Sequence, residues 1–476
     1  MNPEPPLEPD GSSPPDMAVA SPRKWTRRRL LRWALGGASL AAVGGWVASR
    51  RRQEPRRIPT KEELEEGLVE DDAPSWTQSE KEEHAAKWIE EAAPFCYAGH
   101  EGASVNLSMA LKAAPDYAPA RLMSACWFMH TGRWDLVQED LSFPSIRDTP
   151  EGQLLRSLAE RRPRSPDWRH AFFDAWVELG RPDFHDSPLL PAPIRDHDLF
   201  THPQRGLSHT TGPQRLPLLI LSLPLGEPTA ELLEHARAST SVPLLFALRE
   251  QLLPTETQTL ARQSLLTAVE ARLAQLSTSA PRTLQLALVS FLAGKPSTAP
   301  FTREELEALE PLVALPAWKH PSSGDVFQEL YPLFDTWLAP PGHHALLLAS
   351  TAQALSLGQT LLERGRASRA HLPEGSLRLL GRLLWEAGAR LRAQPSHTEL
   401  DLGLRLQMFG SELTGHSPTR EECLGAWVEL GRWEEALARA AYARWPLAAL
   451  HEEACAPRAH DEPAWLRAFL PGGSLP

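Results

Sequence analysis

Apolar residues recur at helical spacing through most of this chain, and this periodicity limits the fold more than any other feature. Leucines and valines three or four positions apart line one face of the stretch 259–276, and a second stripe runs through 376–395. The stripes consist of Leu265, Val269, Leu273 and Leu276, and of Leu377, Leu380, Leu384, Ala387 and Leu391. No segment alternates apolar and polar residues over a sustained stretch, as half-buried strands do. The sequence therefore predicts an all-α fold in which both stripes are buried.

The heptad AWVELGR occurs twice, at residues 175–181 and 426–432. We interpret each copy as the first helix and turn of a helical hairpin. In the second copy Gly431 is placed in the turn, because a glycine inside a helix costs about 1 kcal/mol relative to alanine. In the first copy Pro182 and Pro188 follow the heptad and interrupt the second helix, because proline removes a helical donor and clashes with the preceding turn.

The stretch 110–141 resembles a tetratricopeptide repeat, a 34-residue helix-turn-helix unit with small residues where helices cross. Gly132 falls in the turn within one unit, and that unit then begins at Ala118 and follows an earlier unit from His84 to Tyr117. The resemblance extends to 417–446, where it implies packing roles around Gly431. The residues with these roles are Trp427 and Trp433 as the aromatic positions, and Ala436 and Ala440 as the small ones.

Residues 33–49 are uncharged, and a helix of that length spans roughly 25 Å, the lower limit for crossing a hydrocarbon core. The preceding residues read TRRRLLR and resemble the twin-arginine export motif. The matching residues are Arg27, Arg28, Leu30 and Leu31. No A-x-A cleavage site follows, so we expect an uncleaved single-pass anchor in a bacterial inner membrane. A periplasmic body is the preferred topology, and a cytoplasmic body is the alternative.

The helical periodicity predicts an all-α fold, and the resemblance to tetratricopeptide repeats implies an irregular α-solenoid of helical hairpins behind this one N-terminal transmembrane helix. The expected ranges are a Pro-rich disordered tail (1–22), the signal anchor (23–52), a charged linker (53–76), helical hairpins (77–181), a Pro/His-rich irregular segment (182–228) and a helical domain (229–470) ending in the repeat at 417–446. The formal net charge is −11, while basic residues concentrate in 23–57, so the body is acidic. An acidic body repels phosphate backbones, which argues against nucleic acid as a partner.

Candidate chemical sites are weak in this sequence. His197, Asp198, His202 and His209 cluster in the Pro-rich segment, but their spacing fits no established metal-ligand pattern. The four cysteines are Cys96, Cys126, Cys423 and Cys455, and they form no C-x-x-C pair. Buried thiols and disulfides both remain open for them. We find no nucleophile elbow and no phosphate-binding loop, and we expect no cofactor.

Two functions remain open from the sequence. The preferred one is a membrane-anchored scaffold or adaptor whose helical repeats bind a protein or peptide, because stacked hairpins create a groove without reaction chemistry. Under this interpretation the membrane is contacted through residues 33–49. The alternative is an exported enzyme of unrecognised class, with or without a metal, because the twin-arginine route carries folded proteins.

Overall fold

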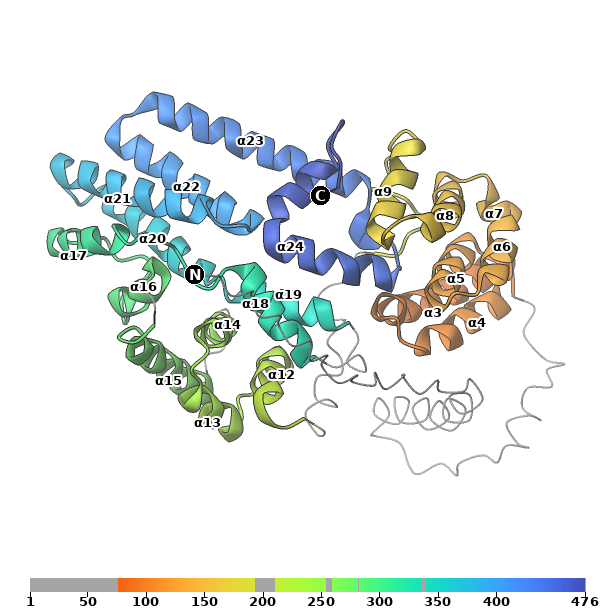
Figure 1. The fold of residues 1–476 in the computed structure, drawn as a ribbon, viewed down its shortest axis with the longest axis horizontal. Coiled ribbons are helices and arrows are strands. Elements are labelled where there is room, and N and C mark those ends of the chain that lie inside the picture. The colour runs from red at the N-terminus through yellow and green to blue at the C-terminus, as the bar shows by residue number, and fades with distance from the viewer. Residues whose placement is uncertain (1–75, 193–209, 254–258, 281, 335–339, 476) are drawn as a thin grey trace, which may run out of the picture. The chain divides into compact units, whose positions relative to one another are not determined.

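The protein is described by a computed structural model that covers residues 76–192, 210–253, 259–280, 282–334 and 340–475. Every regular element in these ranges is a helix, and no strand occurs in them (Figure 1). The all-α prediction is therefore confirmed. The described helices belong to one compact unit, Trp76–Pro476.

The predicted tail, anchor and linker lie outside the described residues, except for Trp76 at the end of the linker. They include the export-motif residues Arg27, Arg28, Leu30 and Leu31. The loop residues His197, Asp198, His202 and His209 also lie outside the described ranges.

Two consecutive helical hairpins begin the described unit. Their helices are α3 (Gln78–Ala98), α4 (Gly102–Ala113), α5 (Ala118–Thr131) and α6 (Trp134–Ser142). Each hairpin turns at a glycine in the left-handed conformation, Gly99 with φ of 64° and Gly132 with φ of 72°. A Cβ atom disfavours this conformation, so glycine suits the position. The turn predicted at Gly132 and the helix start predicted at Ala118 are confirmed.

The first AWVELGR copy ends a helix. It follows α7 (Pro144–Arg147) and α8 (Pro150–Arg161) and lies at the end of α9 (Trp168–Glu178). Gly180 has φ of 80°, and the Arg181 amide donates back to the Trp176 carbonyl at 2.9 Å. Pro182 disfavours helical backbone at the residue before it, so the chain leaves the helix here.

The second AWVELGR copy does not end a helix, and the predicted turn at Gly431 is wrong. Helix α23 (Ser417–Arg439) runs through Gly431 without interruption. The residues after this copy are WEEALAR, which lack proline and favour helix. Packing along one face of α23 outweighs the cost of one interior glycine, because tertiary contacts supply most helix stability in proteins.

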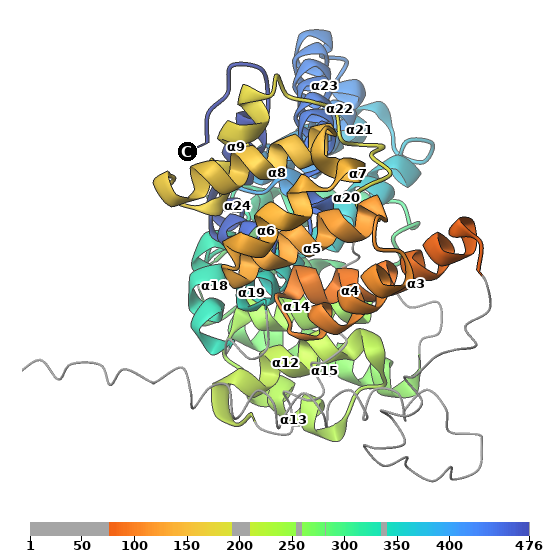
Figure 2. The same cartoon turned by 90° about the vertical axis from the view of Figure 1, so that its right-hand side faces the viewer.

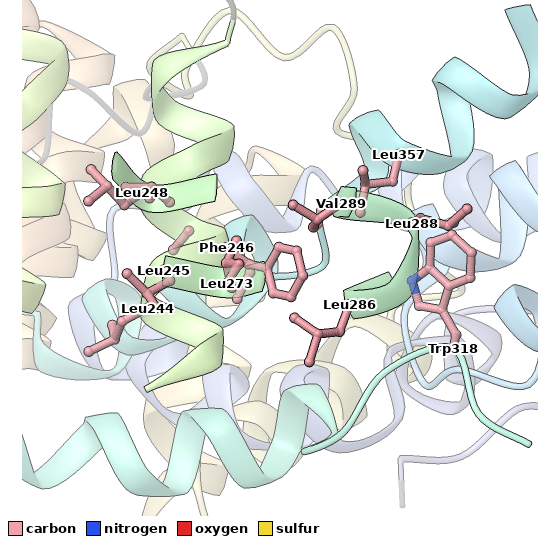
Figure 3. Packing of buried hydrophobic residues seen from close by; sticks show 14 of the residues in the cluster. Leu244, Leu245, Phe246, Leu248, Leu273, Leu286, Leu288, Val289, Trp318 and Leu357 are labelled. Carbon is pink, nitrogen blue, oxygen red and sulfur yellow. The ribbon is translucent and has the colours of Figure 1, made fainter. Parts of the chain in front are cut away.

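The middle of the chain forms the largest hydrophobic core. Its helices are α12 (Arg215–Ser222), α13 (Ala230–Ala238), α14 (Val242–Leu252), α15 (Leu260–Leu276), α16 (Leu284–Leu292), α17 (Arg303–Val313), α18 (Ser323–Leu330), α19 (Pro341–Thr351) and α20 (Leu355–Ser368). Figure 3 shows Phe246 of α14 and Leu286 of α16 pointing into this core, with Trp318 beside Leu288. The predicted stripe on α15 is confirmed, because Leu265, Val269 and Leu273 are at most 1% exposed.

Two long helices, α21 (Glu374–Arg392) and α22 (His397–Thr414), pack with their backbones unusually close. A Cβ atom at Gly381 would lie 2.7 Å from the Gly410 carbonyl oxygen, and one at Gly388 would lie 2.6 Å from the Gly403 carbonyl oxygen. Only glycine fits such an approach. Most of the predicted stripe on α21 is buried. Leu380, Leu384, Ala387 and Leu391 are 0% exposed, whereas Leu377 at its start is partly exposed.

The hydrophobic cores join parts of the chain that the sequence analysis had placed in separate domains. Residues 440–469 share a core with residues 122–190, rather than belonging only to a helical domain at 229–470. The Pro-rich residues 182–191 are held against this core, because the Arg444 guanidinium donates to the carbonyls of Ser187 and Leu190, each at 2.7 Å. The C-terminal end of the chain therefore packs on its first helices.

The last helix, α24 (Ala448–Ala468), places two neighbouring carboxylates at the starts of two distant helices. Glu452 accepts hydrogen bonds from the Gly342 amide of α19 at 2.8 and 3.0 Å. Glu453 accepts from the Trp168 amide of α9 at 2.5 Å. The first amides of a helix lack partners within it and carry partial positive charge, so a carboxylate stabilises them.

A third carboxylate of α24 reaches α22. Glu462 accepts from the His397 amide at the start of that helix at 3.1 Å. The N-cap residues of α22 and α19, Ser396 and Pro340, make no side-chain capping bond of their own. Long-range glutamates thus replace the local caps that these two helices lack.

The two heptad copies predict opposite effects for the same substitution. Gly431→Ala should raise the free energy of unfolding by about 0.5–1 kcal/mol, because it favours helix and a Cβ there meets no atom within 4 Å. Gly180→Ala should lower it by about 1 kcal/mol or more, because its φ is 80°. Urea melts of both variants in dilute solution measure the contrast. A loss of stability in Gly431→Ala would contradict the continuous helix.

The capping by α24 predicts that Glu452→Ala lowers the free energy of unfolding by about 1–2 kcal/mol, since it leaves the α19 amide without its acceptor. Glu452→Gln keeps an acceptor oxygen and should lose less. Glu160→Ala, at an exposed position on α8, is the matched control and should change stability by less than about 0.5 kcal/mol. Equal melts for Glu452→Ala and Glu160→Ala would show that the cap is unimportant.

Candidate functional site

The residues predicted to pack around Gly431 lie on different faces of α23. Trp427 is 42% exposed, and its indole nitrogen donates to Asp401 Oδ1 on α22 at 2.8 Å. Trp433 and Ala436 are partly buried against the core that contains the C-terminal residues. Ala440 is fully buried immediately after the helix end. The structure therefore brings Trp433, Ala436 and Ala440 to one core and leaves Trp427 away from it.

A groove runs between α4 and α5, the two helices on either side of the turn between the first hairpins. It holds about 310 Å³. Its apolar wall consists of Leu107, Leu111, Trp127 and Phe128, and its polar positions are Ser104, Ser108, Lys112 and Ser124. The volume lies at the lower end of the range for small-molecule pockets.

The rim of this groove is exposed to solvent, whereas the side chains of its apolar wall are buried. Ser104, Ser108 and Lys112 are exposed on α4. Leu107 and Trp127 are 3% and 6% exposed and belong to a hydrophobic core formed by α3, α4 and α5. A bound apolar side chain would contact a wall that is already packed, with hydroxyl groups and one ammonium group beside it. Such a site suits the side chains of a peptide, because apolar contact and a few polar groups give affinity and orientation.

A second, more polar cleft of about 520 Å³ lies between α14, α15, α20 and the loop after α16. Arg249 is 8% exposed on its wall, and its guanidinium donates to Glu270 at 3.1 Å and to the Ser356 hydroxyl at 2.8 Å. The Ser356 hydroxyl in turn donates to Glu250 at 2.6 Å. A serine between a carboxylate and a guanidinium is an arrangement that nucleophilic sites also use.

The geometry gives this serine and carboxylate a structural role. Glu250 also accepts from the Ser356 backbone amide at 3.2 Å, at the start of α20. The N-cap residue of α20 is Ala354, which has no side-chain acceptor. Burial raises the pKa of Glu250, while Arg249 and Ser356 oppose that rise. Glu250 therefore caps α20 as the glutamates of α24 cap α19 and α22.

Two histidines of the described residues, His344 and His451, are enclosed in the protein. Burial lowers the pKa of both His344 and His451 to about 4, so both imidazoles are neutral at physiological pH. His451 stacks on Tyr97, with ring centroids 5.0 Å apart, and its Nε2 lies 2.6 Å from the Trp445 carbonyl oxygen. The imidazole ring of His451 therefore has a packing role.

All four cysteines are buried free thiols in the structure. Burial raises the pKa of Cys455 to about 12 and raises that of Cys96 further. A thiol must ionise to attack a substrate or to bind a metal, so these thiols are unreactive in the folded chain. Among the described residues, no group of three or more His, Cys, Asp or Glu side chains is arranged to hold a metal ion.

One stretch of the described chain, Pro341–Ser368, is long and apolar enough to cross a membrane by length and composition. It is 56% buried and comprises α19 and α20. Both helices contribute to the largest core, and Arg364 within α20 is 2% exposed and bonded to Glu305 at 2.8 Å. The stretch thus has the character of core helices.

Comparison with known proteins gives no relative: no protein family, curated protein or solved structure matches this chain. The interpretation of the groove therefore depends on its own residues. Sequence reasoning located α4 and α5 but did not single out the groove residues between them. The serines of α4, spaced four apart at Ser104 and Ser108 beside Leu111, were the available signal.

Proposed function

We propose that this chain is a membrane-anchored helical-repeat scaffold that binds a protein or peptide segment in the groove between α4 and α5. The observation that carries this proposal is the groove itself, with its buried wall of Leu107 and Trp127 and its exposed rim of Ser104, Ser108 and Lys112. Such an arrangement accepts a side chain without any reaction chemistry.

The order of the first helices supports a repeat architecture. Helices α3, α4, α5, α6, α8 and α9 lie beside one another largely in chain order (Figure 2). The two hairpins α3–α4 and α5–α6 have left-handed glycine turns, and Ala103 and Ala110 of α4 are both 0% exposed where helices cross. Small residues at crossings allow the close approach that stacked hairpins need, and stacked hairpins create extended binding surfaces.

The chemistry of the rim suggests the ligand. Lys112 is exposed at the groove, and no ion pair involves it among the residues that the structure describes. A peptide with an apolar side chain close to a carboxylate would place the first against Trp127 and the second near Lys112. Val105 and Met109, which are 57% and 36% exposed on α4, extend the apolar surface beyond the groove.

The anchor remains part of this proposal. The uncharged residues 33–49 are long enough to span a bilayer, and Arg27, Arg28, Leu30 and Leu31 match an export motif. We propose a single-pass protein of a bacterial inner membrane whose helical body faces the periplasm. The linker before Trp76 would then hold the groove away from the bilayer.

Filling the groove tests the binding function. Peptides would be selected from a random library on the purified wild-type protein, and their affinities measured by isothermal titration calorimetry. Ser108→Trp places an indole in the groove from an exposed position and should weaken these peptides by at least about tenfold, because it occludes the pocket.

The matched control is Ser142→Trp, an exposed serine at the end of α6 that does not line the groove. It should bind the selected peptides as the wild type does. Selected peptides that bind Ser108→Trp and Ser142→Trp equally well, or a failure to select any, would contradict peptide binding at this groove. Thermal melts confirm that both variants are folded.

Cell fractionation tests the anchor. The full chain should sediment with membranes, whereas a chain beginning at Trp76, the start of the compact unit, should be soluble. Replacing both Arg27 and Arg28 by lysine should keep the body from external protease in spheroplasts, if export uses the twin-arginine route. Full-length protein at unprocessed mass in the soluble fraction would rule out the anchor, and unchanged protease access would rule out the export route.

A further inference from the structure

Helix α23 carries an apolar face that the described elements leave largely exposed, although the Trp427 indole nitrogen at its edge donates to Asp401 of α22. Leu424, Trp427 and Val428 are 49%, 42% and 50% exposed. Their spacing of three and four places them on one side of the helix. The other side is buried, because Cys423 and Leu430 are 1% and 3% exposed and pack with Leu404 of α22. In Figure 1, α23 lies at the edge of the group formed with α21 and α22.

The same face contains a gap and charged ends. Gly431 lies two turns beyond Leu424, and a Cβ built on it meets no atom within 4 Å. Arg420 and Glu421 are exposed at the N-terminal end of the face. Glu434 and Glu435 are exposed at the other end, where Glu435 pairs with Arg439 at 2.7 Å. Along the helix, the face therefore presents Arg420, then Leu424, the central pair Trp427 and Val428, the gap at Gly431 and finally Glu435.

We propose that this face of α23 binds the same face of a second copy of this chain, with the two helices antiparallel. A twofold axis between Trp427 and Val428 brings Leu424 of each copy level with Gly431 of the other. The same operation brings Arg420 level with Glu435 in both directions. A twofold interface requires such self-complementarity, because each patch must fit itself.

The pairing of Arg420 with Glu435 favours this antiparallel orientation over a parallel one. A parallel pair in register would place Arg420 beside Arg420 and Glu435 beside Glu435, which repel. It would also place leucine against leucine and leave both glycine gaps unfilled. The antiparallel pair fills each gap with a leucine and brings each Arg420 level with a Glu435, while Glu421 comes level with Glu434. A second copy is thus the partner that the leucine-to-gap fit and the Arg420–Glu435 pair favour.

This dimer goes beyond the proposed peptide binding. A contact of one helix pair is small by the standard of specific interfaces, which bury about 1,200–2,000 Å², so we expect a reversible dimer. Two copies would present two α4–α5 grooves to one partner, and bivalent engagement raises apparent affinity without new contacts. The dimer does not depend on the groove. The dimer proposal and the peptide-binding proposal can therefore be tested separately.

Cysteine crosslinking of the full chain in membranes tests the register. Val428→Cys lies beside the twofold axis and should form a disulfide dimer on oxidation by air with copper phenanthroline. Leu424→Cys alone should not, because its two copies would lie about 10 Å apart along the axis, beyond disulfide reach. A mixture of Leu424→Cys and Gly431→Cys should crosslink. The wild type is the background control, since its four thiols are buried.

Charge reversal provides an independent measurement. Arg420→Glu and Glu435→Arg should each reduce the crosslinked fraction of Val428→Cys by about tenfold, since the pair occurs twice in the dimer. The double reversal should restore it. Both positions are exposed, so the variants should melt as the wild type does.

Three outcomes would overturn the proposal. Self-crosslinking of Leu424→Cys as efficient as that of Val428→Cys would indicate a parallel pair. No crosslink at Val428→Cys would mean that another molecule or no molecule covers the face. A double reversal no better than the single variants would remove the charge pairing on which the orientation depends.

Discussion

The rest of this fold depends on how the first amides of its helices obtain hydrogen-bond acceptors. A helix begins with amides that have no partner within it, and these cannot be buried unsatisfied. Eight of the described α-helices begin with a serine or threonine whose side chain accepts from such an amide, as Thr259 does at α15 and Thr302 at α17. Helices α19, α20 and α22 lack such a side-chain cap and take carboxylates from distant helices instead. The N-terminal ends of these helices are therefore held in position by carboxylates of other helices, from Glu452, Glu250 and Glu462.

This dependence explains why the C-terminal helix holds the molecule together. Helix α24 packs against α9 and α3 on one side and against α18 and α19 on the other. Its carboxylates at 452 and 453 are adjacent in sequence, yet they reach helices from the two largest cores. Burial raises the pKa of both groups, so each carboxylate gives up hydration to reach its amide. Glu452 and Glu453 are partly buried acids that would otherwise suggest acid–base chemistry. Their hydrogen bonds to helix amides explain their positions without it.

The sequence predicts this fold well where the signal is local and poorly where it is not. Helical stripes such as Leu265 to Leu273 and the glycine turn at Gly132 depend on periodicity and backbone conformation within a few residues, and both were predicted correctly. The caps from Glu452 and Glu462 join residues far apart in the chain, so no local pattern reveals them. The groove between α4 and α5 was predictable only in part. Its two helices follow from local signals, but the sequence does not show that Ser108 of α4 and Trp127 of α5 line the same groove. The glycine pairs Gly381–Gly410 and Gly388–Gly403 had a visible spacing of seven in each helix, which sequence analysis did not use.

The two AWVELGR copies show how context assigns a structure to identical residues. In the first, Pro182 ends the helix, the glycine adopts a left-handed conformation, and Trp176 is 2% exposed in a core. In the second, helix-favouring residues follow, the glycine remains helical, and the equivalent Trp427 is 42% exposed. The heptad itself thus fixes neither the turn nor the burial of its tryptophan. An exposed tryptophan next to Val428 and above an open Gly431 is costly to leave in water, because apolar area removed from water stabilises by about 25 cal/mol per Å². Trp427, which sequence reasoning placed at the first-helix aromatic position of a repeat, is therefore better explained as part of an external contact.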